Sequence, residues 1–313
     1  MDWTVSAADA GVRLDKFLAA ADRLGSRRQA SVALDRGKVF VNGVEAAPGA
    51  GAARLGAGDR VRVWMDRPGS ARGRTPPRSG ALRGDLRILH EDDAMIVLDK
   101  PAGLLAVPLE RKAAADSVVD QLIVHLRPQG KRKPLVVHRI DRDTSGLVVF
   151  AKTAEAQRAL REQFKRRTVE RVYRAVVYGH PQPPAGTWRD TLVWDQKALI
   201  QKETHPRDPK GKDAVCRYET VERFASTSLL EIRLETGKRN QIRLQARLRG
   251  HTLVGERRYV YGPEELRPIA FPRQALHAFR LAFAHPVTGR PLRFEAPMPP
   301  DMLALVARLR RSA

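Results

Sequence analysis

The side chains best suited to chemistry lie together in the polar segment His138–Gly146. Within it, Asp141 stands between Arg139 and Arg142. A carboxyl group with a reference pKa of about 3.9 is ionised at neutral pH, and an ionised carboxylate is able to act as a nucleophile or as a base. An aspartate in an arginine-rich loop more often forms a structural ion pair, so the residues alone leave both roles open.

Other catalytic signatures are missing from the sequence. The protein-kinase loop has His, Arg and Asp in direct succession, whereas Ile140 separates Arg139 from Asp141 here. The chain contains no Gly-x-Ser-x-Gly elbow, no His-Glu-x-x-His pair and no Walker motif. Cys216 is the only cysteine, which excludes an internal disulfide and a cysteine-rich metal site. We therefore expect a cytoplasmic protein without a metal.

The charge balance indicates a polyanionic partner. Lys and Arg number 57 against 35 Asp and Glu, which gives a net charge of +22. Phosphate groups would offset the mutual repulsion of so many cations, so we expect a nucleic acid, with an anionic membrane surface as the alternative. Charge does not distinguish DNA from RNA. No apolar run approaches the roughly 20 residues that cross a membrane, and the N-terminus does not resemble a secretory signal.

Two apolar runs, residues 135–137 and 147–150, flank the polar segment and predict strands that hold it rigidly at a sheet edge. Residues 86–300 contain further short β-branched runs, with helical stretches between them rather than a regular β-α-β alternation. This pattern predicts an α+β fold, in which helices flank a mixed and mostly antiparallel sheet. A final amphipathic helix begins at Asp301 and places on one face Met302, Leu305, Val306 and Leu309.

Residues 1–66 predict a separate small α/β domain. Leu14, Phe17 and Leu18 recur at helical spacing, and Asn42-Gly43 after a β-branched run is a strong hairpin signal. Residues 67–85 are rich in Pro, Gly, Ser and Arg, which is typical of a flexible basic linker. The second domain would then span residues 86–313. The helix pair and the following strand of the first domain carry neighbouring cations, among them Arg27, Arg28 and Lys38.

The segment His138–Gly146 and the apolar run after it resemble the active-site signature of the RluA-type RNA pseudouridine synthases. Further passages match the same family in the same order, so that the resemblance covers residues 86–300. The first domain resembles the S4-like RNA-binding domain in its phrases at 13–18 and 37–43. The other matching passages are residues 88–93, 98–104, 171–179, 235–243 and 273–278, with His285-Pro286 and Ala296-Pro297.

The resemblance implies an isomerase that flips a uridine out of folded RNA and re-attaches its base through carbon, with no cofactor. It implies that Asp141 is the carboxylate acting at the ribose, and that Arg243, on a strand, pairs with it. It also implies that Tyr173 stacks on the flipped base, with its hydroxyl near the chemistry at C5, and that Arg139 enters the space the nucleotide vacates. His138 is not expected to be an acid or base, and supporting the loop by hydrogen bonding is its alternative role.

Relatives with an S4-like domain imply large-subunit ribosomal RNA as the substrate, with Arg27, Arg28 and Lys38 as further RNA contacts. The sequence does not reveal the oligomeric state, and a monomer is assumed. The sequence departs from the family pattern at Arg239-Asn240, which occupies the place of the usual Thr-His pair. This departure affects the expected local RNA contacts and the choice of uridine. The main alternative is a non-catalytic RNA-binding or ribosome-assembly protein with the same fold, and a DNA-binding protein is a third possibility.

Overall fold

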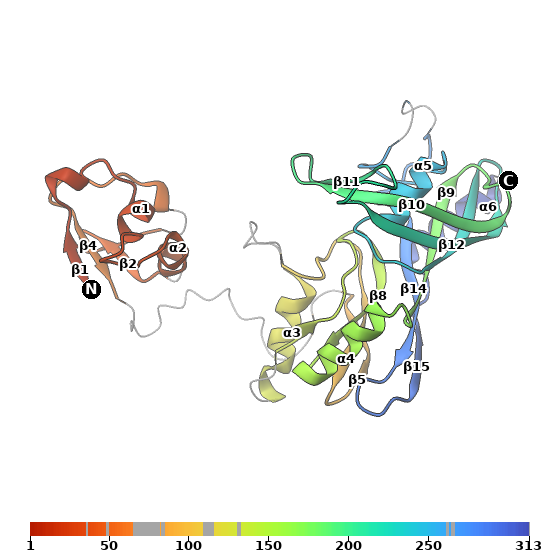
Figure 1. Cartoon of the computed structure of the whole chain (residues 1–313), viewed down its shortest axis with the longest axis horizontal. Coiled ribbons are helices and arrows are strands. Elements are labelled where there is room, and N and C mark those ends of the chain that lie inside the picture. Colours follow the sequence, from red (N-terminus) through yellow and green to blue (C-terminus); the bar gives the residue numbers. More distant parts are fainter. Residues whose placement is uncertain are drawn as a thin grey trace. The chain divides into compact units, whose positions relative to one another are not determined.

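The structure is a computed structural model, in which the chain divides into two compact units, Met1–Arg78 and Ser79–Ala313 (Figure 1). The predicted linker at 67–85 lies outside the described residues, apart from 82 and 85, so its boundaries remain a prediction. The structure describes residues 1–35, 37–47, 50–64, 82, 85–108, 116–129, 133–260, 263 and 267–312.

The first unit packs helices on a small antiparallel sheet. The predicted hairpin is present, with Asn42 and Gly43 at its turn in the left-handed region that such turns require (φ 52° and 79°). Leu14 and Phe17 are buried in one core with the strands, as their helical spacing predicted. The strand order is β1 (Asp2–Thr4), β4 (Arg60–Val63), β2 (Val39–Val41) and β3 (Val44–Glu45), and the helices are α1 (Leu14–Leu18) and α2 (Arg27–Asp35).

The second unit is built on one sheet of eleven strands, and the predicted mostly antiparallel α+β fold is confirmed. Only the pairing of β8 with β14 is parallel among its described ladders. The main strand order is β11 (Ile200–Glu203), β10 (Ala185–Asp195), β12 (Lys212–Arg223), β13 (Thr227–Leu234), β9 (Glu170–Tyr178), β14 (Leu276–Ala284), β8 (Ser145–Ala151), β6 (Met95–Lys100) and β5 (Arg87–Glu91). Two short strands pair beside this path, β7 (Leu135–Val136) with β8 and β15 (Pro291–Glu295) with β14.

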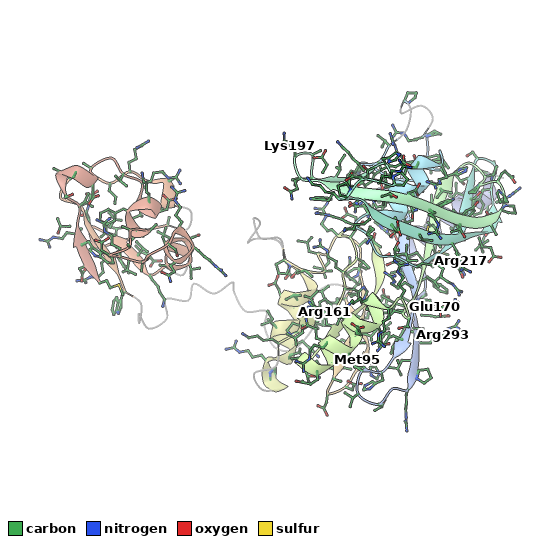
Figure 2. All side chains as sticks on the ribbon, in the orientation of Figure 1. Met95, Arg161, Glu170, Lys197, Arg217 and Arg293 are labelled. Atoms are coloured by element: carbon green, nitrogen blue, oxygen red, sulfur yellow. The ribbon has the colours of Figure 1, made fainter. Side chains whose placement is uncertain are left out.

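Helices flank this sheet on apolar faces. Figure 1 shows α3 (Val118–Leu126) and α4 (Ala154–Lys165) beside the part of the sheet that contains β5 and β8. The predicted last helix, α6 (Pro300–Arg311), is confirmed, and its expected apolar face is buried in one cluster with β9 and β13. At the other end of the sheet, β10 and β11 form a hairpin whose turn carries Lys197 (Figure 2).

The polar segment His138–Gly146 lies between β7 and β8, so its placement between two strands is confirmed. The predicted sheet edge is wrong, because β8 is an interior strand and the segment enters it at one end. Gly146 makes this position possible: its φ is +105°, and a Cβ added there would lie 2.2 Å from the carbonyl oxygen of Ala278. Strand β14 therefore approaches the polar segment more closely than any side chain would permit.

Candidate active site

Lys100, which is fully buried, fixes the loop that carries Asp141. Its ammonium group donates hydrogen bonds to the carbonyl oxygens of Pro101 (2.8 Å), Leu104 (2.9 Å) and Arg142 (2.9 Å). Because the last of these belongs to the residue after Asp141, the charge-assisted bond limits the movement of the Asp141 backbone. The carboxylate itself is 25% exposed and is reachable from solvent.

Arg243 pairs with Asp141 across 102 positions of the chain. Its Nη1 donates to Oδ2 of Asp141 at 3.1 Å, and only 11% of the arginine side chain is exposed. The predicted strand at Arg243 is wrong, because the residue lies in α5 (Gln241–Leu248). The resemblance implied a strand, but Ile242 and Ala246, four positions apart, both face the core, as they do on a helix.

Glu256 holds Arg243 from the opposite side and was not foreseen from the sequence. Its carboxylate accepts two hydrogen bonds from Arg243, both of 2.7 Å, and its side chain is fully buried. The same carboxylate accepts from the backbone N–H groups of Arg257, Arg258 and Tyr259. Burial works to raise the pKa of Glu256, but the hydrogen bonds and charge of Arg243 outweigh it and lower that pKa below its ordinary value.

Asn240 is a second contact of Asp141 that the sequence did not assign. Its Nδ2 donates to Oδ2 of Asp141 at 2.6 Å. The residue precedes α5 and belongs to the Arg239-Asn240 pair that departs from the family pattern. Its neighbour Arg239 lies over the ring of Trp194, with 4.1 Å between the guanidinium carbon and the ring centroid. Asn240, one of the two residues that depart from the family pattern, therefore contacts the candidate carboxylate directly.

Tyr173 and Asp141 line the same small pocket, which has a volume of about 70 Å³. Tyr173 lies on β9 and packs in a buried cluster with Ile140 and Leu276. Burial raises the pKa of Tyr173, Arg171 opposes the shift, and Asp141 adds to it. The phenol therefore keeps its proton at neutral pH.

A basic cleft of about 510 Å³ adjoins this pocket, and Arg139 and Tyr173 line both cavities. Its acidic lining residue, Glu235, already pairs with Arg217 at 2.7 Å. Arg171 is buried and donates only to the carbonyl oxygens of Leu234 and Glu235, and no carboxylate within the described residues pairs with it. The cationic lining residues of this basic cleft are Arg139, Lys165, Arg167, Arg171 and Lys238.

His138 supports the loop through contacts on both its ring nitrogen and its ring face. Its Nε2 accepts a hydrogen bond from the backbone N–H of Val149 at 3.1 Å, and its ring stacks on Phe164 at 4.6 Å. Burial, aided by the charge of Arg171, lowers the pKa of His138 to about 3. The imidazole is therefore neutral at physiological pH, in line with the role expected of it.

In the first unit, a cavity of about 560 Å³ is lined by two of the three predicted RNA contacts, Arg28 and Lys38. Arg27 opens α2 beside them but is not among the lining residues. In the described part of the chain, no group of three or more His, Cys, Asp and Glu side chains is placed to hold a metal ion. No helix in that part is both long and apolar enough to span a membrane.

Comparisons with known proteins agree on one family. A family model described as RNA pseudouridylate synthase matches residues 94–248. The uncharacterized RNA pseudouridine synthase YlyB of Bacillus subtilis is 36% identical over 100% of this chain and 99% of its own length. The ribosomal large subunit pseudouridine synthase D of Neisseria meningitidis is 35% identical over 97% of this chain and 80% of its own length.

A solved structure shares the fold at low sequence identity. Human RNA pseudouridylate synthase domain containing 4 superposes with a TM-score of 0.58, covering 71% of this chain and 92% of that one. Its sequence identity of 22% makes it evidence for the fold alone.

Proposed function

Because the chain belongs to the RNA pseudouridylate synthase family, we propose that it isomerises uridines of large-subunit ribosomal RNA, with Asp141 acting at the ribose. The family membership makes the chain an RNA pseudouridine synthase, an isomerase, rather than the non-catalytic alternative. The ribosomal substrate is supported by relatives named ribosomal large subunit pseudouridine synthase D, among them that of Xanthomonas campestris, 36% identical over 97% of this chain. The single observation that carries the role of Asp141 is its ion pair with the buried Arg243–Glu256 couple.

The reaction requires one bond to break and another to form in the same nucleotide. The bond between C1′ and N1 breaks, the uracil rotates, C1′ joins C5, and the proton on C5 is released while N1 gains one. Since no electrons and no group are imported, protein side chains suffice. Asp141 serves either by attacking C1′ or by removing the proton from C2′, and both routes need an ionised carboxylate in reach of the ribose.

The uridine reaches Asp141 only outside the helical stack, because a stacked nucleotide buries its ribose and base. Tyr173 lines the pocket of Asp141 and supplies an aromatic face for the extruded base, where stacking contributes about 1–3 kcal/mol. Arg139 lines both this pocket and the basic cleft, which supports its role in the space that the nucleotide vacates. The orientation of the base thus depends on Tyr173, and its extrusion on Arg139.

The basic cleft supports an RNA strand beside the extruded uridine. Its cations have few local carboxylates to pair with, and phosphate groups satisfy that surplus of positive charge. The first unit is proposed to add an S4-like contact to structured RNA through Arg27, Arg28 and Lys38. The lining of its cavity by Arg28 and Lys38 supports this assignment. A cytoplasmic monomer is the proposed form.

Mapping pseudouridines in ribosomal RNA tests the proposal. RNA is compared from cells with the gene, without it, and with an Asp141→Ala allele that is expressed at the normal level. We expect discrete large-subunit positions to lose pseudouridine without the gene, and the Asp141→Ala allele to leave them unmodified. Unchanged large-subunit sites together with lost transfer-RNA sites would reassign the substrate. If the Asp141→Ala allele restored pseudouridine at all sites, Asp141 would not take part in the reaction.

A further inference from the structure

The two hydrogen bonds that Asp141 accepts through its side chain end on the same oxygen. Asn240 donates to Oδ2 at 2.6 Å and Arg243 donates to Oδ2 at 3.1 Å. Within the described residues, no hydrogen bond reaches Oδ1. A carboxylate held in this way has one oxygen for anchoring and one for reaction, because the donors withdraw charge from Oδ2 and leave a lone pair of Oδ1 available.

Asn240 precedes α5, but its side chain does not cap the helix. An asparagine in this position normally accepts a hydrogen bond from a backbone N–H of the first helical turn. Here the side chain makes no such cap, and the backbone adopts the left-handed region, with φ 53° and ψ 24°. Asparagine tolerates this conformation better than most residues. The amide is thereby free to reach Asp141 from the N-terminus of α5.

A chain of hydrogen bonds fixes which end of the Asn240 amide faces the carboxylate. The backbone N–H of Gln201, on β11, donates to the hydroxyl of Tyr259 at 3.0 Å. That hydroxyl donates in turn to Oδ1 of Asn240 at 3.3 Å. The hydroxyl accepts from this N–H and has its own proton left to donate to Oδ1, while the carboxylate of Asp141 only accepts, so Nδ2 of Asn240 points to Asp141. Burial raises the pKa of Tyr259, so the hydroxyl keeps the proton that this direction requires.

From this geometry we propose that Asn240 is a positioning residue, which holds Oδ2 of Asp141 so that Oδ1 faces the ribose of the extruded uridine. Tyr259 acts through Asn240 by fixing its amide. The inference rests on the proposed function, since it concerns the same carboxylate. It also gives a physical meaning to the departure at Arg239-Asn240, because the asparagine amide supplies a donor that carries no charge of its own.

Two substitutions separate the amide donor from the backbone conformation. Asn240→Gly removes the side chain while keeping a residue that adopts a positive φ without strain. Asn240→Asp keeps the shape of the side chain and its tolerance of the left-handed region, but replaces the donor with a second carboxylate. Each variant is compared with wild type by tritium release from RNA containing [5-³H]uridine, by RNA affinity and by thermal unfolding.

We expect kcat to fall about 10- to 100-fold in both variants, which is the rate equivalent of a hydrogen bond to a charged group. KM and RNA affinity should stay within about twofold, because the Asn240 side chain is largely buried and its amide is already bonded to Asp141 and Tyr259. Asn240→Asp should also move the acidic limb of the kcat–pH profile to higher pH, since a neighbouring carboxylate raises the pKa of Asp141. A merely structural role would instead lower the melting temperature and the RNA affinity of Asn240→Gly together with its kcat.

A double-mutant cycle tests the relay through Tyr259. Tyr259→Phe should lower kcat several-fold in the wild-type background, while the ring that packs beside Arg243 is kept. In the Asn240→Gly background the same change should have no further effect, because there is no amide left to orient. Additive losses would remove Tyr259 from the relay.

The outcomes distinguish this inference from the function on which it rests. The positioning role is overturned if wild type is active and the kcat of Asn240→Gly lies within twofold of the wild-type value. It is also overturned if Asn240→Asp does not move the acidic limb of the kcat–pH profile. If wild type releases no tritium from any cellular RNA, the proposed function fails instead. The carboxyl carbon of Asp141 then reports directly by ¹³C NMR on the RNA-free protein, where an identical titration of wild type and Asn240→Asp also overturns the inference.

Discussion

Replacing Glu256 by glutamine is a sharp perturbation of the site, because it removes a charge while keeping the size of the side chain. Glu256 has a fully buried side chain that holds Arg243 with two hydrogen bonds of 2.7 Å. It also accepts backbone N–H groups from the three residues that follow it. A glutamine must direct its own NH₂ group at one of these donors, so at least one bond is replaced by a repulsive contact.

The expected loss in the free energy of unfolding is about 3 kcal/mol. Breaking a buried ion pair by removing one partner costs about 3–5 kcal/mol, because the remaining charge is left uncompensated. The lower end of this range applies here, because Asp141 remains 3.1 Å from Arg243 and still compensates part of its positive charge. The matched control is Glu222→Gln, whose partner Arg310 is 59% exposed and whose loss should cost less than about 1 kcal/mol.

Urea unfolding followed by tryptophan fluorescence measures this loss. Trp188 and Trp194 report on the second unit, whereas Trp3 and Trp64 report on the first and provide an internal reference. Because the pKa of Glu256 is lowered in the folded state, its contribution is fully present above pH 4.5 and is lost as the pH falls through the folded-state pKa. The difference in the free energy of unfolding between wild type and Glu256→Gln should therefore become smaller as the pH falls.

Two results would refute this reasoning about Glu256. One is a loss below about 1 kcal/mol at pH 7, equal to that of the surface control, which would mean that Arg243 does not depend on Glu256 for compensation. The other is a difference in the free energy of unfolding between wild type and Glu256→Gln that does not change with pH. A loss of kcat without a loss of stability would mean that Glu256 acts in catalysis and not by stabilising Arg243.

Three further predictions concern the pocket, the basic cleft and the strand beneath them. Tyr173→Phe removes the hydroxyl expected near C5 and should lower kcat by about 100-fold, while RNA affinity should stay within about twofold because the stacking ring is kept. Because burial raises the pKa of Tyr173, no limb of the rate profile below pH 10 should come from it. Lys238→Ala should weaken RNA binding and reduce the slope of log Kd against log salt by about one, as filter binding at several salt concentrations would measure. Gly146→Ala should cost about 3 kcal/mol in urea unfolding, since the added carbon would meet the carbonyl of Ala278.

Sequence patterns predicted the frame of the site well. The apolar runs around His138–Gly146 form β7 and β8, and the last amphipathic helix is α6. These elements follow from local periodicity, which depends only on which face of a strand or helix is buried. The meeting of Asp141 and Arg243 followed from family resemblance, because no local pattern connects residues that lie 102 positions apart.

The contacts that support the carboxylate were beyond the reach of the sequence. Glu256 is one of many acids in the chain, and only its burial against Arg243 gives it significance. Asn240 was visible as a departure from a family pattern, but its contact with Asp141 depends on a left-handed backbone that no local pattern specified. The strand expected at Arg243 came from the resemblance alone, whereas Ile242 and Ala246 follow the spacing of a helix and lie in α5.

Tritium release by Asp141→Ala is the most direct test of the central claim, that the Asp141 carboxylate isomerises an extruded uridine. Large-subunit ribosomal RNA made with [5-³H]uridine is incubated with wild type or with the variant, and RNA binding is measured in parallel. We expect wild type to release tritium and Asp141→Ala to release none, while both proteins bind the RNA with similar affinity. Release by Asp141→Ala at the wild-type rate would contradict the claim.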